Sequence, residues 1–195
     1  MKYLFALFVS MVLFSCVDNQ VADNNAVATP ESAAIPEGAI QEPYQDNSAM
    51  VKVTIKNEAG NVVEQGDLLN GHKVGNWTAF YTNGVVKSVT GYVDGVMQGM
   101  HIEMGQRGEI EKRCYYHNGQ LHGDYVVYNR NRIKEEKTYE NGLLQGVAKS
   151  YYDNGTLMEE SPYSDGKRDG LSRWYDQEGN VSIEYEYDNG ELVEK

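Results

Sequence analysis

The stretch FYTNGVVKSVTGYVDG, residues 80–95, returns in altered form as YYDNGTLMEESPYSDG at residues 151–166. Both copies keep an aromatic start, an Asn-Gly pair, a late Tyr and a closing Asp-Gly pair. Asx-Gly pairs of the closing kind begin at positions 70, 94, 118, 141, 165 and 189, in steps of 24, 24, 23, 24 and 24 residues. A fixed period of this length is typical of a repeat array.

The units share several further columns. A second Gly follows four residues after each leading Gly: Gly75, Gly99, Gly123, Gly146 and Gly170. A turn Gly stands near the middle of four units: Gly84, Gly108, Gly155 and Gly179. The third unit has NRNR, residues 129–132, in place of that turn and is one residue short. A Tyr stands two residues before each following Asx: Tyr92, Tyr116, Tyr139, Tyr163 and Tyr187.

These columns predict two short antiparallel strands per unit. Asx-Gly between apolar runs favours a type I′ hairpin turn, which needs positive φ at both central residues, and we expect two such turns in each unit. The aliphatic column (Val86 in the first unit) and the Tyr column lie six residues apart, so alternation places them on one sheet face. Gly75 and its equivalents fall within a strand, where a bulge would bend the sheet. The predicted fold class is all-β: an elongated single-layer antiparallel sheet of repeated β-hairpins.

The segment before the repeats predicts an address and a tether. MKYLFALFVSMVLFSC has one cation and then a 12-residue apolar stretch, which is too short to span a bilayer but suits a signal peptide. It resembles a bacterial lipoprotein signal, which implies cleavage before Cys16 and lipidation of that residue; an ordinary secretory signal with an incidental Cys is the alternative. We therefore expect a signal peptide at 1–15, a lipidated Cys16 with a disordered tether at 16–49, an N-terminal capping half-repeat at 50–69, and five repeats plus a C-terminal cap at 70–195.

Charge and cysteine content exclude some roles. The chain has 17 Lys and Arg against 29 Asp and Glu, a net charge of −12, which argues against nucleic-acid binding because phosphate neutralisation needs a positive surface. After cleavage before Cys16 the remaining cysteines are Cys16 and Cys114, and with Cys16 lipidated no internal disulfide is possible. We interpret Cys114 as a buried or idle thiol, with pairing between two chains as the alternative.

The repeats resemble a known family. NGHKVGNWTAFYTNGVVKSVTGYVDG and NGLLQGVAKSYYDNGTLMEESPYSDG are similar to the MORN-repeat variant of bacterial proteins, and the resemblance extends over about residues 51–194. It implies a single-layer sheet of hairpins that acts as a scaffold or binding surface. Some members carry an antitoxin label. The matching residues are structural, so the resemblance implies no catalytic set.

We find no constellation that predicts catalysis, a metal or a cofactor. Of the four histidines, His117 and His122 lie five residues apart across a predicted turn without further ligands, and we interpret them as solvated. Most glycines fall in the repeat columns, so turn geometry explains them. Paired carboxylates such as Glu135-Glu136 could serve acid–base chemistry, calcium or a basic partner, but neighbours in a strand point to opposite faces, which favours solvated charge.

We therefore predict a protein that binds a protein partner and is not an enzyme. It would be lipid-anchored in the bacterial envelope, at the outer membrane, with an aromatic strip and an acidic rim facing the partner. The candidate contact residues are Trp77, Tyr81, Tyr125, Tyr128, Tyr152 and Trp174. The alternative is an antitoxin or immunity protein that covers a basic toxin. A third reading, an enzyme acting on envelope glycans through a carboxylate pair, needs a cleft that a single-layer sheet does not offer.

Overall fold

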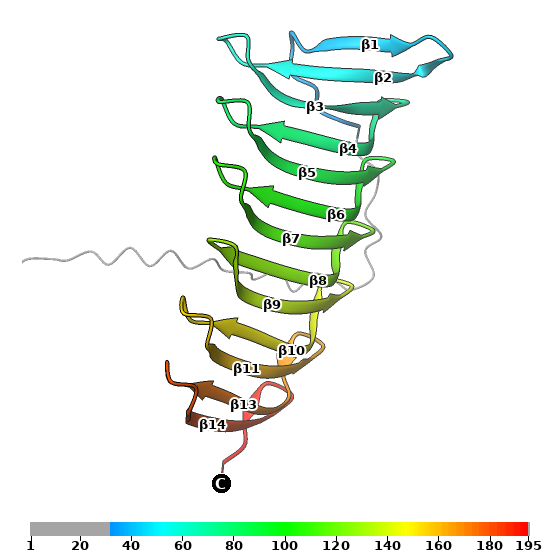
Figure 1. Ribbon diagram of the computed structural model, residues 1–195. Helices are drawn as coiled ribbons and strands as arrows, with labels where there is room; N and C mark the ends of the chain where they lie inside the picture. Colours follow the sequence, from blue (N-terminus) through cyan, green and yellow to red (C-terminus); the bar gives the residue numbers. More distant parts are fainter. Residues whose placement is uncertain (1–31, 195) are drawn as a thin grey trace, which may run out of the picture.

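The computed structural model describes residues 32–194, which form one open antiparallel sheet of 15 strands (Figure 1). This confirms the predicted fold class. Within residues 32–194 no helix has the length and hydropathy that crossing a bilayer requires. The predicted signal peptide, Cys16 and the first part of the predicted tether lie outside the described residues.

Each strand pairs with the next one along the chain, except that β13 follows β11 in the sheet and the short β12 pairs with β11 at its side. The first eight strands are β1 (Ile40–Tyr44), β2 (Asn47–Lys56), β3 (Val62–Leu69), β4 (His72–Phe80), β5 (Val86–Val93), β6 (Val96–Met104), β7 (Ile110–His117) and β8 (Gln120–Asn129). The remaining strands are β9 (Arg132–Glu140), β10 (Leu143–Tyr151), β11 (Leu157–Ser164), β12 (Lys167–Arg168), β13 (Gly170–Tyr175), β14 (Val181–Asp188) and β15 (Glu191–Leu192). We number the repeats from the leading Asx: repeat 1 is 70–93, repeat 2 is 94–117, repeat 3 is 118–140, repeat 4 is 141–164 and repeat 5 is 165–188.

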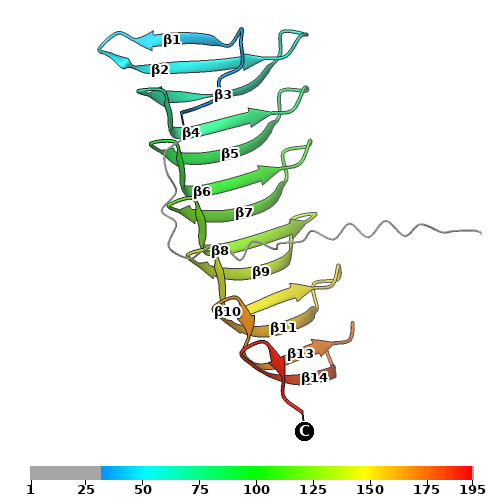
Figure 2. The same ribbon diagram turned by 180° about the vertical axis from the view of Figure 1, so that it is seen from behind.

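The turns that open the repeats have the predicted geometry. Asn70 and Gly71 have φ values of 52° and 85°, and the later Asx-Gly pairs repeat this pattern. Two consecutive positive φ values are the mark of a type I′ turn, which Asn and Gly tolerate best. These leading turns lie at one edge of the sheet, and the second turns of the repeats lie at the other (Figures 1 and 2).

The second turns differ from the prediction. In repeat 1 the Gly84 N–H donates to the Tyr81 carbonyl (2.9 Å) and the Tyr81 N–H donates to the Val85 carbonyl (2.8 Å). Gly84 has positive φ, whereas Asn83 before it does not. The second turns are therefore longer loops with one left-handed residue, and the prediction of two type I′ turns per repeat is wrong for four of the five. Repeat 3 is the exception: Arg130 (φ 49°) and Asn131 (φ 64°) form a two-residue turn, because this repeat lacks the extra residue.

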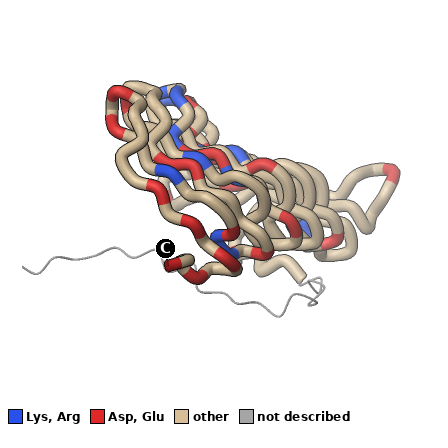
Figure 3. The backbone as a smooth tube through the Cα atoms, turned by 90° about the horizontal axis from the view of Figure 1, so that it is seen from below, with Lys and Arg blue, Asp and Glu red and all other residues tan. Residues whose placement is uncertain are grey.

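The predicted bulge is present at the second Gly column. Between β3 and β4 the pairing advances from Asp67–Val74 to Gln65–Thr78, so β4 has two extra residues at this point. Gly75, inside the bulge, has φ 65°, a value that Gly adopts without steric cost. Similar register shifts recur between β5 and β6, β7 and β8, and β9 and β10. The strands are accordingly bent at the bulges, and in the view from below each repeat follows a curved path (Figure 3).

The two sheet faces differ. Direct cross-strand pairs join Trp77 to Thr90, Thr90 to His101, His101 to Cys114 and Cys114 to Tyr125. Directly paired residues point to the same side, so this row defines one face, which we call the packed face. Trp77, Thr90 and Cys114 on it are buried. The sequence predicted that alternation places the aliphatic column and the Tyr column on one face. A register shift follows Val86 in the pairing of β4 with β5, so alternation alone does not establish this.

The N-terminal end of the sheet contains more structure than predicted. Val53, Leu68 and Trp77 form a buried cluster, and Ala33, Ile35 and Ala39 pack against it. The segment that follows forms β1 and the first residues of β2. The disordered tether predicted for 16–49 is therefore wrong over residues 32–49: small and aliphatic side chains there bury apolar surface on the first repeat, which offsets the ordering entropy.

The C-terminal end is capped less than predicted. β15 pairs with Tyr187 and Asp188 of β14, and the Val193 N–H donates to the Glu186 carbonyl (2.9 Å). Among the described residues, nothing pairs with the outer side of β14 from Val181 to Tyr185. The final segment therefore covers one end of the last strand and leaves the rest of that edge open.

Candidate functional site

Hydrogen bonds between second turns join neighbouring repeats at one edge of the sheet. The Tyr81 hydroxyl of repeat 1 donates to the Met104 carbonyl of repeat 2 (2.8 Å), and the Tyr152 hydroxyl of repeat 4 donates to the Tyr175 carbonyl of repeat 5 (2.7 Å). Asn83 reinforces the first of these contacts through the Gln106 carbonyl (3.1 Å). The turns of these repeats are thereby held against one another.

Repeat 2 cannot make this bridge to repeat 3. Gly105 occupies the position of Tyr81, and a Cβ there would lie 2.7 Å from the Glu109 carboxyl carbon, so a larger side chain does not fit unless Glu109 moves. The shortened turn of repeat 3 is joined to repeat 4 in another way: Arg132 donates to the Asp153 carbonyl (2.7 Å) and the Asn129 amide donates to the Asp153 carboxylate (2.9 Å). The irregular repeat thus separates two regular parts of the edge.

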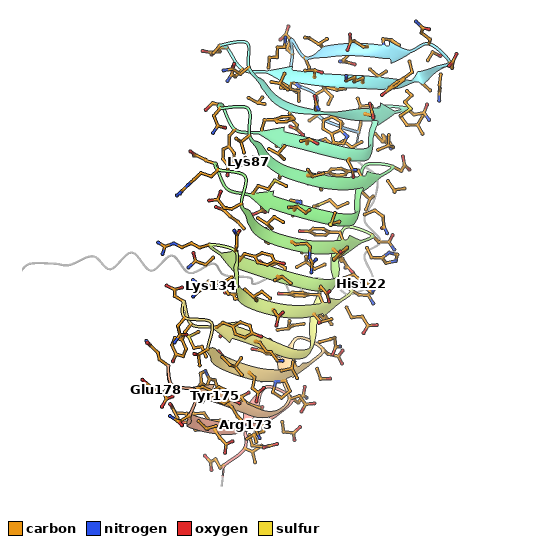
Figure 4. The ribbon with its side chains drawn as sticks, viewed as in Figure 1. Lys87, His122, Lys134, Arg173, Tyr175 and Glu178 are labelled. Atoms are coloured by element: carbon orange, nitrogen blue, oxygen red, sulfur yellow. The ribbon has the colours of Figure 1, made fainter. Side chains whose placement is uncertain are left out.

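A groove of about 730 Å3 lies at this irregularity. We call it the turn-edge groove. Its apolar and aromatic lining consists of Ile110, Tyr125, Val127 and Tyr128. Its charged lining consists of Arg107, Lys112, Arg130 and Lys134 together with Glu103, Glu109 and Glu111. A smaller hollow of about 360 Å3 begins at Lys134 and continues along the edge past Tyr151, Tyr152 and Met158. Lys134 is labelled in Figure 4 at this edge.

The groove is more basic than the chain as a whole. Lys112 forms an ion pair with Glu103. Burial opposes the charge of Lys112, but the Glu103 carboxylate outweighs it and raises the pKa of Lys112 above its usual value. Within the described part of the chain, no carboxylate lies at ion-pair distance from Arg107, Arg130 or Lys134. Three cations are therefore free to meet an anionic group in an otherwise acidic protein.

The predicted contact residues on the packed face have structural roles. Trp77 is 3% exposed; its Nε1–H donates to the Asp67 carbonyl (3.0 Å), and the Lys73 ammonium lies 4.0 Å from its ring centre. Trp77 has almost no accessible surface for a partner, so we leave it out of the candidate site. Trp174 packs edge-on against Tyr185, with ring centres 6.0 Å apart, and the Arg168 guanidinium lies 5.3 Å from its ring.

The other predicted contact residues divide between bridges and grooves. The hydroxyl groups of Tyr81 and Tyr152 are used in the inter-repeat bridges, although Tyr152 also lines the smaller hollow. Tyr125 and Tyr128 line the turn-edge groove. Burial raises the pKa of Tyr125 above its usual value. The six residues therefore do not form one continuous strip, and two of them line the turn-edge groove.

The sequence did not reveal a polar chain on the packed face. The Thr90 hydroxyl lies 2.8 Å from His101 Nδ1, and His101 Nε2 lies 3.0 Å from the Glu103 carboxylate, which also meets Lys112. His101 has 12% of its side chain exposed, and neither it nor Thr90 lines the grooves described above. The period of the repeat marked the position of His101, and Glu103 lies two residues further along the same strand, but Thr90 comes from β5 and could not be found by spacing alone.

The remaining reactive residues do not gather into a site. Cys114 is a free, buried thiol, and burial raises its pKa. Its predicted burial is confirmed. The rings of His117 and His122 lie 5.5 Å apart on the exposed surface. Between residues 32 and 194, no three His, Cys, Asp or Glu side chains converge so that they could hold a metal ion.

The fold and this site define a class: a repeat protein whose hairpins form a single open sheet with exposed grooves. Residues 73–94, 144–165 and 168–194 match the MORN repeat variant, which supports the identification of the units as MORN-type repeats. The unmatched stretch, 95–143, contains the irregular repeat 3 and the turn-edge groove. A comparison with curated proteins gave no match. MORN repeats are generally associated with membrane or protein binding.

Proposed function

We propose that this chain is a binding protein that holds a segment of a partner protein in the turn-edge groove. The observation that carries the proposal is the loss of the tyrosine bridge between repeats 2 and 3, which coincides with an aromatic floor and three unpaired cations. A thin sheet without an enclosed cavity offers surface rather than a reaction chamber, and aromatic side chains beside Arg are the groups that dominate protein interfaces.

The chemistry of the groove selects the kind of partner. Tyr125, Tyr128 and Val127 can pack an apolar or aromatic anchor, while Arg107, Arg130 and Lys134 can pair with carboxylates beside it. The partner segment is therefore acidic with at least one large apolar side chain. The sequence alone predicted an acidic rim facing the partner, whereas the lining of the groove favours an acidic partner segment.

We further propose that the protein acts from a membrane. The resemblance of residues 1–16 to a lipoprotein signal supports a lipid anchor at Cys16, with the repeats presented in the bacterial envelope at the outer membrane. Two or more acyl chains would give stable attachment, whereas one would not. Labelling of cells with an alkyne fatty acid is expected to mark the full chain, and Cys16→Ala should abolish the label and release the protein from membranes. Retention of the label in Cys16→Ala would contradict the anchor.

A photocrosslinking experiment tests the groove. We would place p-benzoylphenylalanine at Tyr128, inside the groove, or at Val93, which is 61% exposed at the opposite edge of the sheet. A specific partner should crosslink from Tyr128 and not from Val93. The charge reversals Arg107→Glu and Lys134→Glu should reduce the Tyr128 crosslink at least fivefold while the circular dichroism spectrum is unchanged. Equal crosslinking from both positions would reject the groove as the binding site.

An antitoxin role is the second candidate, and the acidic residues at the C-terminal end of the sheet favour it. A basic toxin would be covered there and not in the turn-edge groove. In that case deletion of the gene should harm the cell in the presence of an adjacent toxin-like gene, and the reversals in the groove should leave protection intact.

A further inference from the structure

The last full strand of the sheet has an open edge. β14 is paired with β13 on one side along its whole length, while β15 pairs with its final two residues, Tyr187 and Asp188. Within the described residues, no strand pairs with the other side of β14 from Val181 to Tyr185. This edge is at the lower end of the sheet in Figures 1 and 2.

Side chains of β14 are more exposed than the equivalent side chains of interior strands, because no described strand follows β14 on its outer side from Val181 to Tyr185. Tyr185 stands in the column of Thr90, Cys114 and Ser161, which are 8%, 0% and 1% exposed where a following strand covers them. Tyr185 itself is 46% exposed, and Ile183 beside it is 47% exposed. A hollow of about 370 Å3 lies here, lined by Tyr185, Leu192, Val193 and three glutamates. The edge is thus apolar with an acidic border.

The repeats show which residue belongs opposite this edge. On the reverse face, Glu136 of β9 is paired with Lys149 of β10, and Glu160 of β11 is paired with Arg173 of β13. The Arg173 guanidinium reaches Glu160 at 3.2 Å. Glu184 is the next acid in this column. Each earlier acid in the column is therefore paired in register with a cation of the strand that follows. The Glu184 carboxylate accepts from Arg173 of the preceding strand (2.8 Å), and no described strand pairs with its other side.

A tyrosine two residues after each cation completes the pattern. The Tyr151 hydroxyl donates to Glu136 (2.7 Å), and the Tyr175 hydroxyl donates to Glu160 (2.6 Å). The incoming strands accordingly read Lys149-Ser150-Tyr151 and Arg173-Trp174-Tyr175, which is Lys/Arg-x-Tyr in both cases. Glu160 accepts from both Arg173 and Tyr175, so at this position the cation and the tyrosine recognise one carboxylate together. Figure 4 labels Arg173 and Tyr175, which come from the same strand.

We infer that the open edge of β14 accepts an extended segment of a partner protein as an additional antiparallel strand, with a Lys/Arg-x-Tyr sequence opposite Glu184. The main-chain groups of β14 supply the affinity and Glu184 supplies the selectivity, as in other cases of strand addition. The acidic border formed by Glu184, Glu186 and Glu194 favours a basic segment. The inference rests on the proposed protein-binding function but not on the turn-edge groove.

A second copy of the chain does not fit this edge as well. Its own Lys/Arg-x-Tyr strands, β10 and β13, are already paired on both sides. Its open edge at the other end is β1, whose sequence IQEPY contains no cation and includes Pro43, which has no N–H to donate. The occupant is therefore a strand from a different protein.

Binding of a labelled peptide tests the inference. The probe is fluorescein-labelled GLSRWYD, the sequence of residues 170–176, titrated with the full chain in a fluorescence anisotropy assay. Replacing its Arg by Glu should weaken binding at least tenfold, because the hydrogen bond from the charged guanidinium to Glu184 is lost. Replacing its Tyr by Phe should weaken binding about fivefold, because the hydrogen bond from the uncharged hydroxyl to Glu184 is lost. Addition of the peptide should also slow amide hydrogen exchange at residues 181–185.

Protein variants complete the design. Glu184→Gln should weaken binding of the Arg peptide about tenfold, whereas Glu58→Gln, in the exposed turn between β2 and β3, should leave it unchanged. Equal binding of the Arg and Glu peptides would overturn the inference, as would protection of amides elsewhere. Concentration-dependent dimerisation that excludes the peptide would show instead that a second copy occupies the edge. The groove variants Arg107→Glu and Lys134→Glu should bind the peptide normally, so failure of the groove proposal and failure of this inference are distinguishable.

Discussion

Tyrosine hydroxyl groups connect the repeats in different ways at different columns. At the second-turn edge, Tyr81 and Tyr152 donate to carbonyl groups of the next repeat. Within the strands β10 and β13, Tyr151 and Tyr175 donate to Glu136 and Glu160 of the preceding repeat strand. Each such bond contributes about 1 kcal/mol to stability. The high tyrosine content therefore serves contacts between neighbouring repeats.

Two tyrosines predict how stability depends on pH at the alkaline end. Burial, together with nearby Cys114, raises the pKa of Tyr116 to about 12, and burial with the hydrogen bond to Glu136 raises the pKa of Tyr151 to about 12. In the unfolded chain a tyrosine titrates near pH 10. The folded state thus favours the protonated phenol, and this stabilisation is complete below about pH 10 and is lost as the pH rises through about 12.

The measurement is the free energy of unfolding in urea between pH 8 and pH 12, in a Cys114→Ala background that removes the titration of the thiol. We expect stability to fall above pH 10, and the fall to be shallower in Tyr116→Phe and in Tyr151→Phe because phenylalanine does not titrate. Identical slopes in all three proteins would contradict the assignment.

At the scale of the elements, the short turn of repeat 3 has two opposing effects. Arg130 holds a left-handed conformation that is unfavourable for a residue with a Cβ, by roughly 1–2 kcal/mol. The same turn lines the turn-edge groove, which stays open because Gly105 of repeat 2 carries no tyrosine bridge to it. A strained hairpin is therefore located at the proposed binding site.

Arg130→Gly should stabilise the protein by about 1 kcal/mol, because glycine adopts positive φ without steric cost. Arg107→Gly is the matched control: it removes a cation from the same groove at a residue without positive φ, and it should not stabilise. Both variants should weaken partner crosslinking at Tyr128. Urea denaturation gives the stability, and a destabilised Arg130→Gly would contradict the strain.

At the scale of the whole molecule, each repeat contacts its neighbours in sequence and little else. The sheet order follows the chain order throughout, with β12 as a short side pairing. Charges of both signs are interspersed along the sheet (Figure 3). In such an array stability is close to a sum over repeats and their interfaces.

Removal of one whole repeat should therefore be tolerated. Deletion of residues 94–117 joins Val93 to the Asn118-Gly119 turn and keeps every column in phase. The shortened chain should remain β-structured, with a urea m-value about one seventh smaller, because m follows the surface buried and 24 of the 163 described residues are removed. Deletion of residues 94–105 removes half a repeat and should abolish cooperative unfolding. Loss of structure in the first variant would contradict a nearest-neighbour array.

Much of the architecture was predictable, because it depends on residues whose local conformation is restricted. Asn70-Gly71 and its equivalents identified the leading turns, and Gly75 identified the bulge, since few other residues adopt these φ values. The second turns were predicted wrongly because Asn83-Gly84 has the same dipeptide pattern as a type I′ turn but sits in a longer loop. The structure of residues 32–49 was missed because its packing on Trp77 is a contact between distant segments.

The sequence did not predict which aromatic residues of the candidate sites are accessible. Tyr125 and Tyr128 were chosen for their aromatic character, yet what makes them available is Gly105 and the short turn of repeat 3, which act together across different strands. Trp77 was chosen for the same reason and is buried, because the bend brings its ring against Gly66.

The sequence by itself determined the number of repeats, their strands and the order of the sheet, because turn-forming residues at a fixed period act locally. Only the tertiary structure decided which aromatic residues are buried, where the turns open into a groove, and that the outer side of β14 has no described partner strand at Glu184. Those features depend on register and curvature, which arise when many weak cross-strand contacts are satisfied together and which no single segment encodes.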